Sequence, residues 1–122
     1  MSKLPAIQYP RPPAHVARFV EALGFELGIT FLLTFGGATL YIPDRPTDKS
    51  RLVKVIGVDG VARLADVRHL LPKEVPLATP WLARCFKARG MSIADIARSL
   101  RRTEGTIRRY LTADRNDYGG KV

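Results

Sequence analysis

The fold is decided by the stretch Ser92-Ile-Ala-Asp-Ile-Ala-Arg-Ser-Leu-Arg-Arg-Thr-Glu-Gly-Thr-Ile-Arg-Arg-Tyr-Leu111, in the last third of the chain. Apolar residues recur at i, i+3, i+4 and i+7 over residues 93–100, which is one face of a helix. Ser92 precedes them as a predicted N-cap, and Asp95 lies three residues further on, as in a capping box. The pattern then breaks and restarts after Thr103, a second predicted N-cap. The stretch therefore predicts two helices joined by three or four residues.

The second predicted helix has one apolar face and one basic face. Ile107, Tyr110 and Leu111 share the apolar face. The opposite face of this helix is predicted to read base edges in a DNA major groove. Together with the N-cap of the helix, this face comprises Thr103, Glu104, Gly105, Thr106, Arg108 and Arg109. Two helices with a short turn, and the small Ala97 at their crossing, are typical of a helix-turn-helix. The alternative is an ordinary helical hairpin with a solvated basic face.

Further cations flank the basic face and are predicted to contact DNA phosphates. They are Lys87, Arg89, Arg98, Arg101 and Arg102. Arg101 departs from the usual helix-turn-helix pattern, because it stands at the turn position that commonly holds glycine. Its side chain is unfavourable if the backbone there takes a positive φ.

The charge of the chain favours a polyanionic partner. The formal net charge is +9, from 20 Lys and Arg against 11 Asp and Glu. Residues 79–122 hold ten of these cations against four acids, whereas residues 1–78 hold ten against seven. The basic excess is therefore concentrated around the predicted helix-turn-helix, where it suits DNA. A merely soluble basic surface would explain the sign of the charge but not its position.

The composition does not indicate an enzyme or a metal site. Cys85 is the only cysteine, which excludes a disulfide framework and a thiol metal cluster. His15 and His69 are far apart and have no carboxylate in a recognisable arrangement, so structural roles are expected for both. Gly36-Gly37 lacks the lysine of a phosphate loop. We expect no enzymatic activity, no catalytic residue, no metal and no cofactor.

The same composition predicts a cytoplasmic protein. The N-terminal residues lack the apolar segment and cleavage site of a secretory leader. The longest uncharged run, residues 27–43, is close to the roughly 18 residues of a membrane span, but it ends in Gly36-Gly37 and a strand-like stretch, so we expect no membrane span. We therefore expect the chain in the bacterial cell, associated with the nucleoid, with no membrane partner.

The pattern along the chain predicts a mainly α fold with one short strand. Helical spacing begins at residue 14, is interrupted at Gly24, and resumes up to Gly36-Gly37. One or two further helices are predicted over residues 50–69, and another from Trp81 to Gly90. The predicted organisation begins with a flexible Pro-rich arm over residues 1–13 and a dimerisation domain over residues 14–70. A linker over residues 71–78, a helix-turn-helix domain over residues 79–113 and a flexible tail over residues 114–122 follow.

Residues 38–42 alternate and are rich in strand formers, which predicts a lone strand. A strand with no partner exposes unpaired backbone groups, and the prolines near Val75 make pairing within the chain weak. We therefore expect a homodimer in which this strand pairs with its copy across a twofold axis. The alternative is a segment that merely extends over a helix.

The predicted dimer would place several residues near its axis. They are Gly36, Gly37, Thr39 and Tyr41. Here the backbone could approach the minor groove between two half-sites. Alternatively, the glycines only terminate the preceding helix.

The stretch Phe35-Gly-Gly-Ala-Thr-Leu-Tyr-Ile-Pro43, followed by a helix-turn-helix, resembles the Mor/C family of phage middle- and late-operon transcription activators. The resemblance covers about residues 16–112. It implies a phage or prophage activator that binds an imperfect dyad as a dimer and recruits RNA polymerase. Residues 69–76 depart from the family, which often repeats a Gly-rich strand there.

Two function classes follow. The first is a sequence-specific, DNA-binding transcriptional regulator, expected to act as a dimeric activator beside a promoter. The alternative is a phage-type adaptor or antirepressor that uses its helix-turn-helix as a protein-binding surface.

Overall fold

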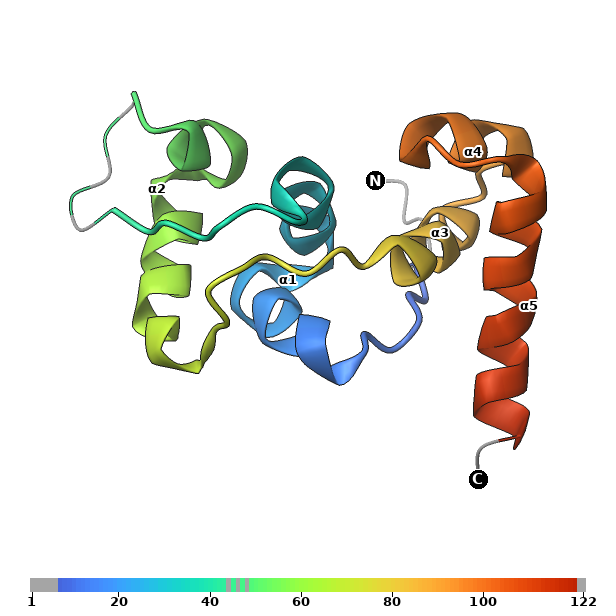
Figure 1. The fold of residues 1–122 in the computed structure, drawn as a ribbon. Coiled ribbons are helices and arrows are strands. Elements are labelled where there is room, and N and C mark those ends of the chain that lie inside the picture. Colours follow the sequence, from blue (N-terminus) through green and yellow to red (C-terminus); the bar gives the residue numbers. More distant parts are fainter. Residues whose placement is uncertain (1–6, 44, 46, 48, 121–122) are drawn as a thin grey trace, which may run out of the picture. The chain divides into compact units, whose positions relative to one another are not determined.

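The structure is a computed structural model that describes residues 7–43, 45, 47 and 49–120, with only the backbone described for residues 113–120. Two compact units divide it: Pro12–Ala78, and residues 7–11 together with residues 79–120. Within this part of the chain the elements are α1 (Ala14–Phe35), α2 (Arg51–Asp66), the 3-10 helix η1 (Arg68–Leu70), α3 (Thr79–Ala88), α4 (Ile93–Leu100) and α5 (Glu104–Gly120) (Figure 1). The predicted mainly α architecture is confirmed.

Helices α1 and α2 are each broken by a glycine. Gly24 has φ 84° and ψ 169°, which are not helical values, so α1 consists of two helical segments that meet at a kink. A side chain disfavours this backbone conformation, which explains why glycine stands there. Gly57 breaks α2 in the same way, with φ 78°. The predicted interruption at Gly24 is confirmed, and where one or two helices are predicted over residues 50–69 the structure has α2 in two segments.

The core of Pro12–Ala78 lies between α1 and α2. The rings of Phe19 and Phe31 stack with their centroids 5.4 Å apart, and both side chains are buried. Leu64 of α2 is also fully buried. At the edge of the core, the guanidinium of Arg51 lies 5.4 Å from the ring centroid of Phe35, a cation–π contact. The helical spacing of apolar residues in α1 therefore produces the buried face that it predicts.

The segment predicted as a lone strand has a partner in its own chain. Among the described residues, residues 38–42 form no strand but a single antiparallel bridge, between Thr39 and Glu74. Leu40 donates its N–H to the carbonyl of Lys73 at 2.6 Å, and the N–H of Val75 donates to Ala38 at 2.9 Å. The prolines are expected to make this pairing weak, but the bridge forms, because the prolines at 72 and 76 lie just outside the positions that donate. Residues 71–78, predicted as a linker, belong to the Pro12–Ala78 unit.

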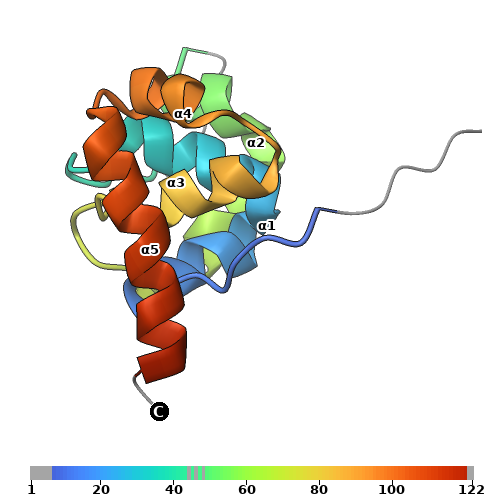
Figure 2. The ribbon, with the colours of Figure 1, turned by 90° about the vertical axis from the view of Figure 1, so that its right-hand side faces the viewer.

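Helices α3, α4 and α5 pack against one another in the second unit (Figure 2). Their shared core contains Trp81, Phe86, Ile96 and Ile107, all at most 4% exposed. Cys85 is buried as well, as predicted for a small apolar side chain. The backbone of α5 stays helical through Gly120, beyond the start of the tail predicted from residue 114. Among the described residues, no helix has both the length and the apolar character needed to span a bilayer.

Candidate nucleic-acid interface

The turn between α4 and α5 is closed by a residue in the left-handed conformation. Arg101 has φ 59° and ψ 45°, and it is the only residue other than glycine with positive φ in the described part of the chain. The N–H of Arg102 then reaches the carbonyl of Ala97 at 3.0 Å, which closes the end of α4 as a Schellman motif does. A left-handed backbone costs a residue with a side chain about 1–2 kcal/mol. The expected conflict at Arg101 is confirmed.

Both helices of this pair begin at capped residues. The Ser92 hydroxyl accepts from the N–H of Asp95 at 3.1 Å, and the Thr103 hydroxyl accepts from the N–H of Thr106 at 3.2 Å. Both predicted N-caps are confirmed. The carboxylate of Asp95, however, forms an ion pair with Arg98 of the same helix, rather than the reciprocal capping-box bond.

The structure separates the two faces of α5 as the sequence predicts. Ile107 is fully buried against the other helices, and Tyr110 and Leu111 are half-buried. The opposite face is open: Thr103, Glu104, Gly105, Arg108 and Arg109 are exposed, and Thr106 is half-buried. The six residues predicted to meet DNA therefore gather at the first two turns of α5 and its cap.

The two arginines of the open face are held only by weak contacts. The Arg108 guanidinium donates to the Glu104 carboxylate at 3.3 Å, with 60% and 51% of the two side chains exposed. Arg109 donates to the hydroxyl of Thr106 at 3.2 Å. An exposed pair at i, i+4 contributes only about 0.3–0.5 kcal/mol. An arginine bonded to a guanine edge contributes about 1–3 kcal/mol, so contacts within the chain as weak as these would not hold the two arginines back from such a ligand.

The predicted phosphate contacts fall into two groups. The side chains of Lys87 and Arg101 are exposed and form no hydrogen bond or ion pair among the described residues. Arg98 is paired with an acid, and Arg102 donates to the carbonyls of residues 100 and 101 at 3.3 and 3.2 Å. Arg89 is engaged by the N-terminal segment. Lys87 and Arg101 are therefore the cations most readily available to a polyanion.

Residues 7–11 pack against α3, a contact that the sequence analysis missed. The indole N–H of Trp81 donates to the carbonyl of Pro10 at 3.0 Å. The Nε–H of Arg89 donates to the Tyr9 hydroxyl at 3.0 Å, and its guanidinium lies 5.9 and 5.4 Å from the ring centroids of Tyr9 and Phe86. The arm predicted over residues 1–13 is thus, over this part, attached to the helical unit.

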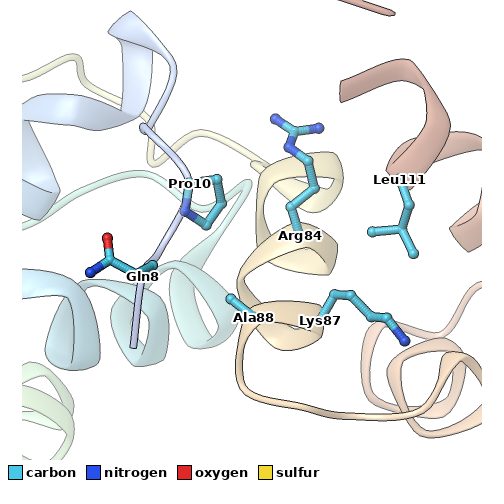
Figure 3. Close-up of a pocket in the computed structure, with 6 residues that line it drawn as sticks. All are labelled: Gln8, Pro10, Arg84, Lys87, Ala88 and Leu111. Atoms are coloured by element: carbon cyan, nitrogen blue, oxygen red, sulfur yellow. The ribbon is translucent and has the colours of Figure 1, made fainter. Parts of the chain in front are cut away.

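A cavity of about 320 Å³ lies beside this contact (Figure 3). In this view Gln8 and Pro10 stand on one side of α3, and Leu111 of α5 stands on the other. Arg84, Lys87 and Ala88 of α3 complete the lining. Among the predicted site residues only Lys87 lines this cavity, so it is not the predicted DNA-reading face.

The residues predicted near a dimer axis lie in the Pro12–Ala78 unit. A Cβ on Gly36 would stand 2.7 Å from the carbonyl oxygen of Leu32, and Gly37 has φ 87°. Both glycines are therefore required by the turn after α1. Thr39 is exposed, and the side chain of Tyr41 is 77% exposed.

No family model, no curated protein and no solved structure matches the chain.

Proposed function

We propose that the chain is a sequence-specific, double-stranded DNA-binding transcriptional regulator. The observation that carries the proposal is the open face of α5. A capped helix, packed through Ile107 and entered by a tight turn, presents Arg108 and Arg109 to solvent. This is the arrangement by which a helix-turn-helix places its second helix in a major groove.

The distribution of charge supports the same proposal. Residues 79–122 carry ten Lys and Arg against four Asp and Glu. Lys87 and Arg101, exposed on α3 and on the turn before α5, would contact phosphates, while the α5 arginines contact base edges. Phosphate contacts supply affinity for any duplex, and base contacts supply selectivity. The proposed mechanism therefore divides the two tasks between two sets of cations.

The resemblance to Mor/C activators extends the proposal to a homodimer that binds a dyad beside a promoter and recruits RNA polymerase. The bridge at Thr39 supports a dimer in one respect. Backbone groups alternate in direction along an extended segment, and those of residues 38 and 40 are bonded to residues 73–75. The backbone of Thr39 and Tyr41 would then face the opposite edge, where a second copy could pair.

Selection of bound duplexes from a random pool, followed by affinity measurements over a range of salt, tests DNA binding. We expect a selected sequence, and a fall in affinity with salt of about 0.9 log units per log unit for each phosphate contact. Footprinting the selected site would show whether it is a dyad. Failure to enrich any sequence, together with a salt slope near zero, would contradict DNA binding and favour a protein-binding adaptor.

Tyr41→Glu tests the dimer. Because the Tyr41 side chain is 77% exposed, we expect a glutamate there to leave the fold of one chain unchanged. At a twofold axis, however, it would bring two like charges together and favour the monomer. Sedimentation should show a dimer for the parent chain and a monomer for the variant, with thermal unfolding as the check on folding. A variant that sediments as the parent dimer would rule out pairing at this edge.

A further inference from the structure

Gly105, in the first turn of α5, has no structural role that requires glycine. Gly24, Gly37, Gly57 and Gly90 have positive φ. The hypothetical Cβ atoms of Gly28, Gly36 and Gly60 would stand 3.5 Å or less from other atoms. Gly105 alone, among the glycines whose surroundings the structure describes, combines a backbone without positive φ with empty space within 4 Å of a Cβ.

Glycine at such a position weakens the helix. An exposed helical site with room for a side chain favours alanine, because glycine loses more conformational freedom on folding. The fold therefore gains nothing from Gly105. A residue that lowers the stability of the fold and has no structural role is expected where a binding partner requires it.

The surroundings of Gly105 indicate what that partner is. Gly105, Arg108 and Arg109 lie at i, i+3 and i+4, so they share one face of the helix. Arg108 is bonded to Glu104 and Arg109 to Thr106, the two chain neighbours of Gly105, and neither guanidinium comes within 4 Å of a Cβ built on the glycine. Apart from the two chain neighbours and the helix backbone, no atom lies within 4 Å of a Cβ built on Gly105, so the face that carries the two arginines is open at this position. The edge of a purine in the major groove presents acceptor atoms that match such donors, and guanine presents two.

We propose that Gly105 sets the depth at which α5 enters the major groove, with a base-pair edge lying against the bare helix backbone. This inference rests on the proposed function and names the closest point of contact within it. A Cβ extends about 1.5 Å from the backbone. That displacement would lengthen the arginine hydrogen bonds from about 2.9 Å toward distances beyond 3.5 Å, at which they are lost.

The test compares Gly105→Ala and Gly105→Gln with the parent chain on the selected duplex and on a random duplex. The open space at this position lets both variants fold, so we expect the midpoint of thermal unfolding to rise by roughly 2–5 °C for alanine. Affinity for the selected duplex should fall about tenfold with alanine, and further with glutamine. The salt slope should stay unchanged, because neither variant alters the charge.

Thr30→Ala is the matched control, since it places a stronger helix former at an exposed, uncharged position in the other unit. It should leave selective binding unchanged. If the parent selects a sequence and Gly105→Ala binds it equally well, the close approach at Gly105 is wrong and the proposed function stands. A selective loss without a loss of stability supports the inference. If the parent selects no duplex at all, both proposals fail together.

Discussion

Replacing Arg108 and Arg109 together with alanine is expected to abolish sequence-selective DNA binding. Each arginine that reads a base edge contributes about 1–3 kcal/mol of discrimination, so the pair should cost roughly thirtyfold or more in affinity for the selected duplex. Both side chains are exposed, and within the chain they make only surface contacts. Folding should therefore be almost unaffected. Fluorescence anisotropy on selected and random duplexes, with circular dichroism as the folding check, measures the two effects.

The matched control removes the same charge from the other unit. Arg18 and Arg63 are exposed on α1 and α2, and their double replacement by alanine lowers the net charge equally. We expect the control to weaken binding to selected and random duplexes alike, and only slightly. If it costs as much selectivity as the α5 pair, or if the α5 pair binds as the parent does, then the face of α5 does not read bases.

Replacing Trp81 with alanine is expected to destabilise the helical unit by about 3–5 kcal/mol, the usual cost of emptying a buried aromatic site. The side chain is 1% exposed and also holds residues 7–11 through its bond to Pro10. Trp81→Phe separates these two contributions, because it keeps most of the apolar contact and removes the N–H donor. That variant should lose about 0.5–1.5 kcal/mol for the hydrogen bond, in addition to a smaller packing change.

Both variants remove Trp81, the only tryptophan of the chain, and with it the tryptophan fluorescence. Their chemical denaturation is therefore followed by circular dichroism. Tyr9→Phe is a companion variant that keeps the indole and removes the hydroxyl that accepts from Arg89. A loss of up to about 1 kcal/mol is expected for this exposed contact. If Trp81→Phe and Tyr9→Phe are both as stable as the parent chain, the N-terminal segment contributes nothing to the stability of the helical unit.

Local features of the fold could be predicted from the sequence. Gly24 interrupts its helix, Ser92 and Thr103 cap theirs, and Arg101 stands at the turn position that commonly holds glycine and has a positive φ. Each feature depends on the backbone preferences of a few neighbouring residues, which the sequence states directly. The open face of α5 follows similarly from the burial of Ile107 and its neighbours at helical spacing.

Contacts between distant segments could not be predicted in this way. The bonds from Trp81 to Pro10 and from Arg89 to Tyr9 join residues 71 and 80 positions apart. They involve single aromatic and polar groups, which leave no periodic pattern. The pairing of Leu40 with Lys73 was missed for another reason: proline is unfavourable only where the ladder needs its N–H.

The attachment of residues 7–11 to α3 also affects the order of events during synthesis. Residues 9 and 10 are synthesised before their partners on α3, which follow only after the whole of Pro12–Ala78. At about 5–20 residues per second, a separation of 71 residues corresponds to a delay of roughly 4–14 s. Pro12–Ala78, which has its own core, has been synthesised completely before α3 is made. The helical unit, by contrast, cannot be completed until α3 has been made, although one of its segments, residues 7–11, precedes the whole of Pro12–Ala78 in the chain.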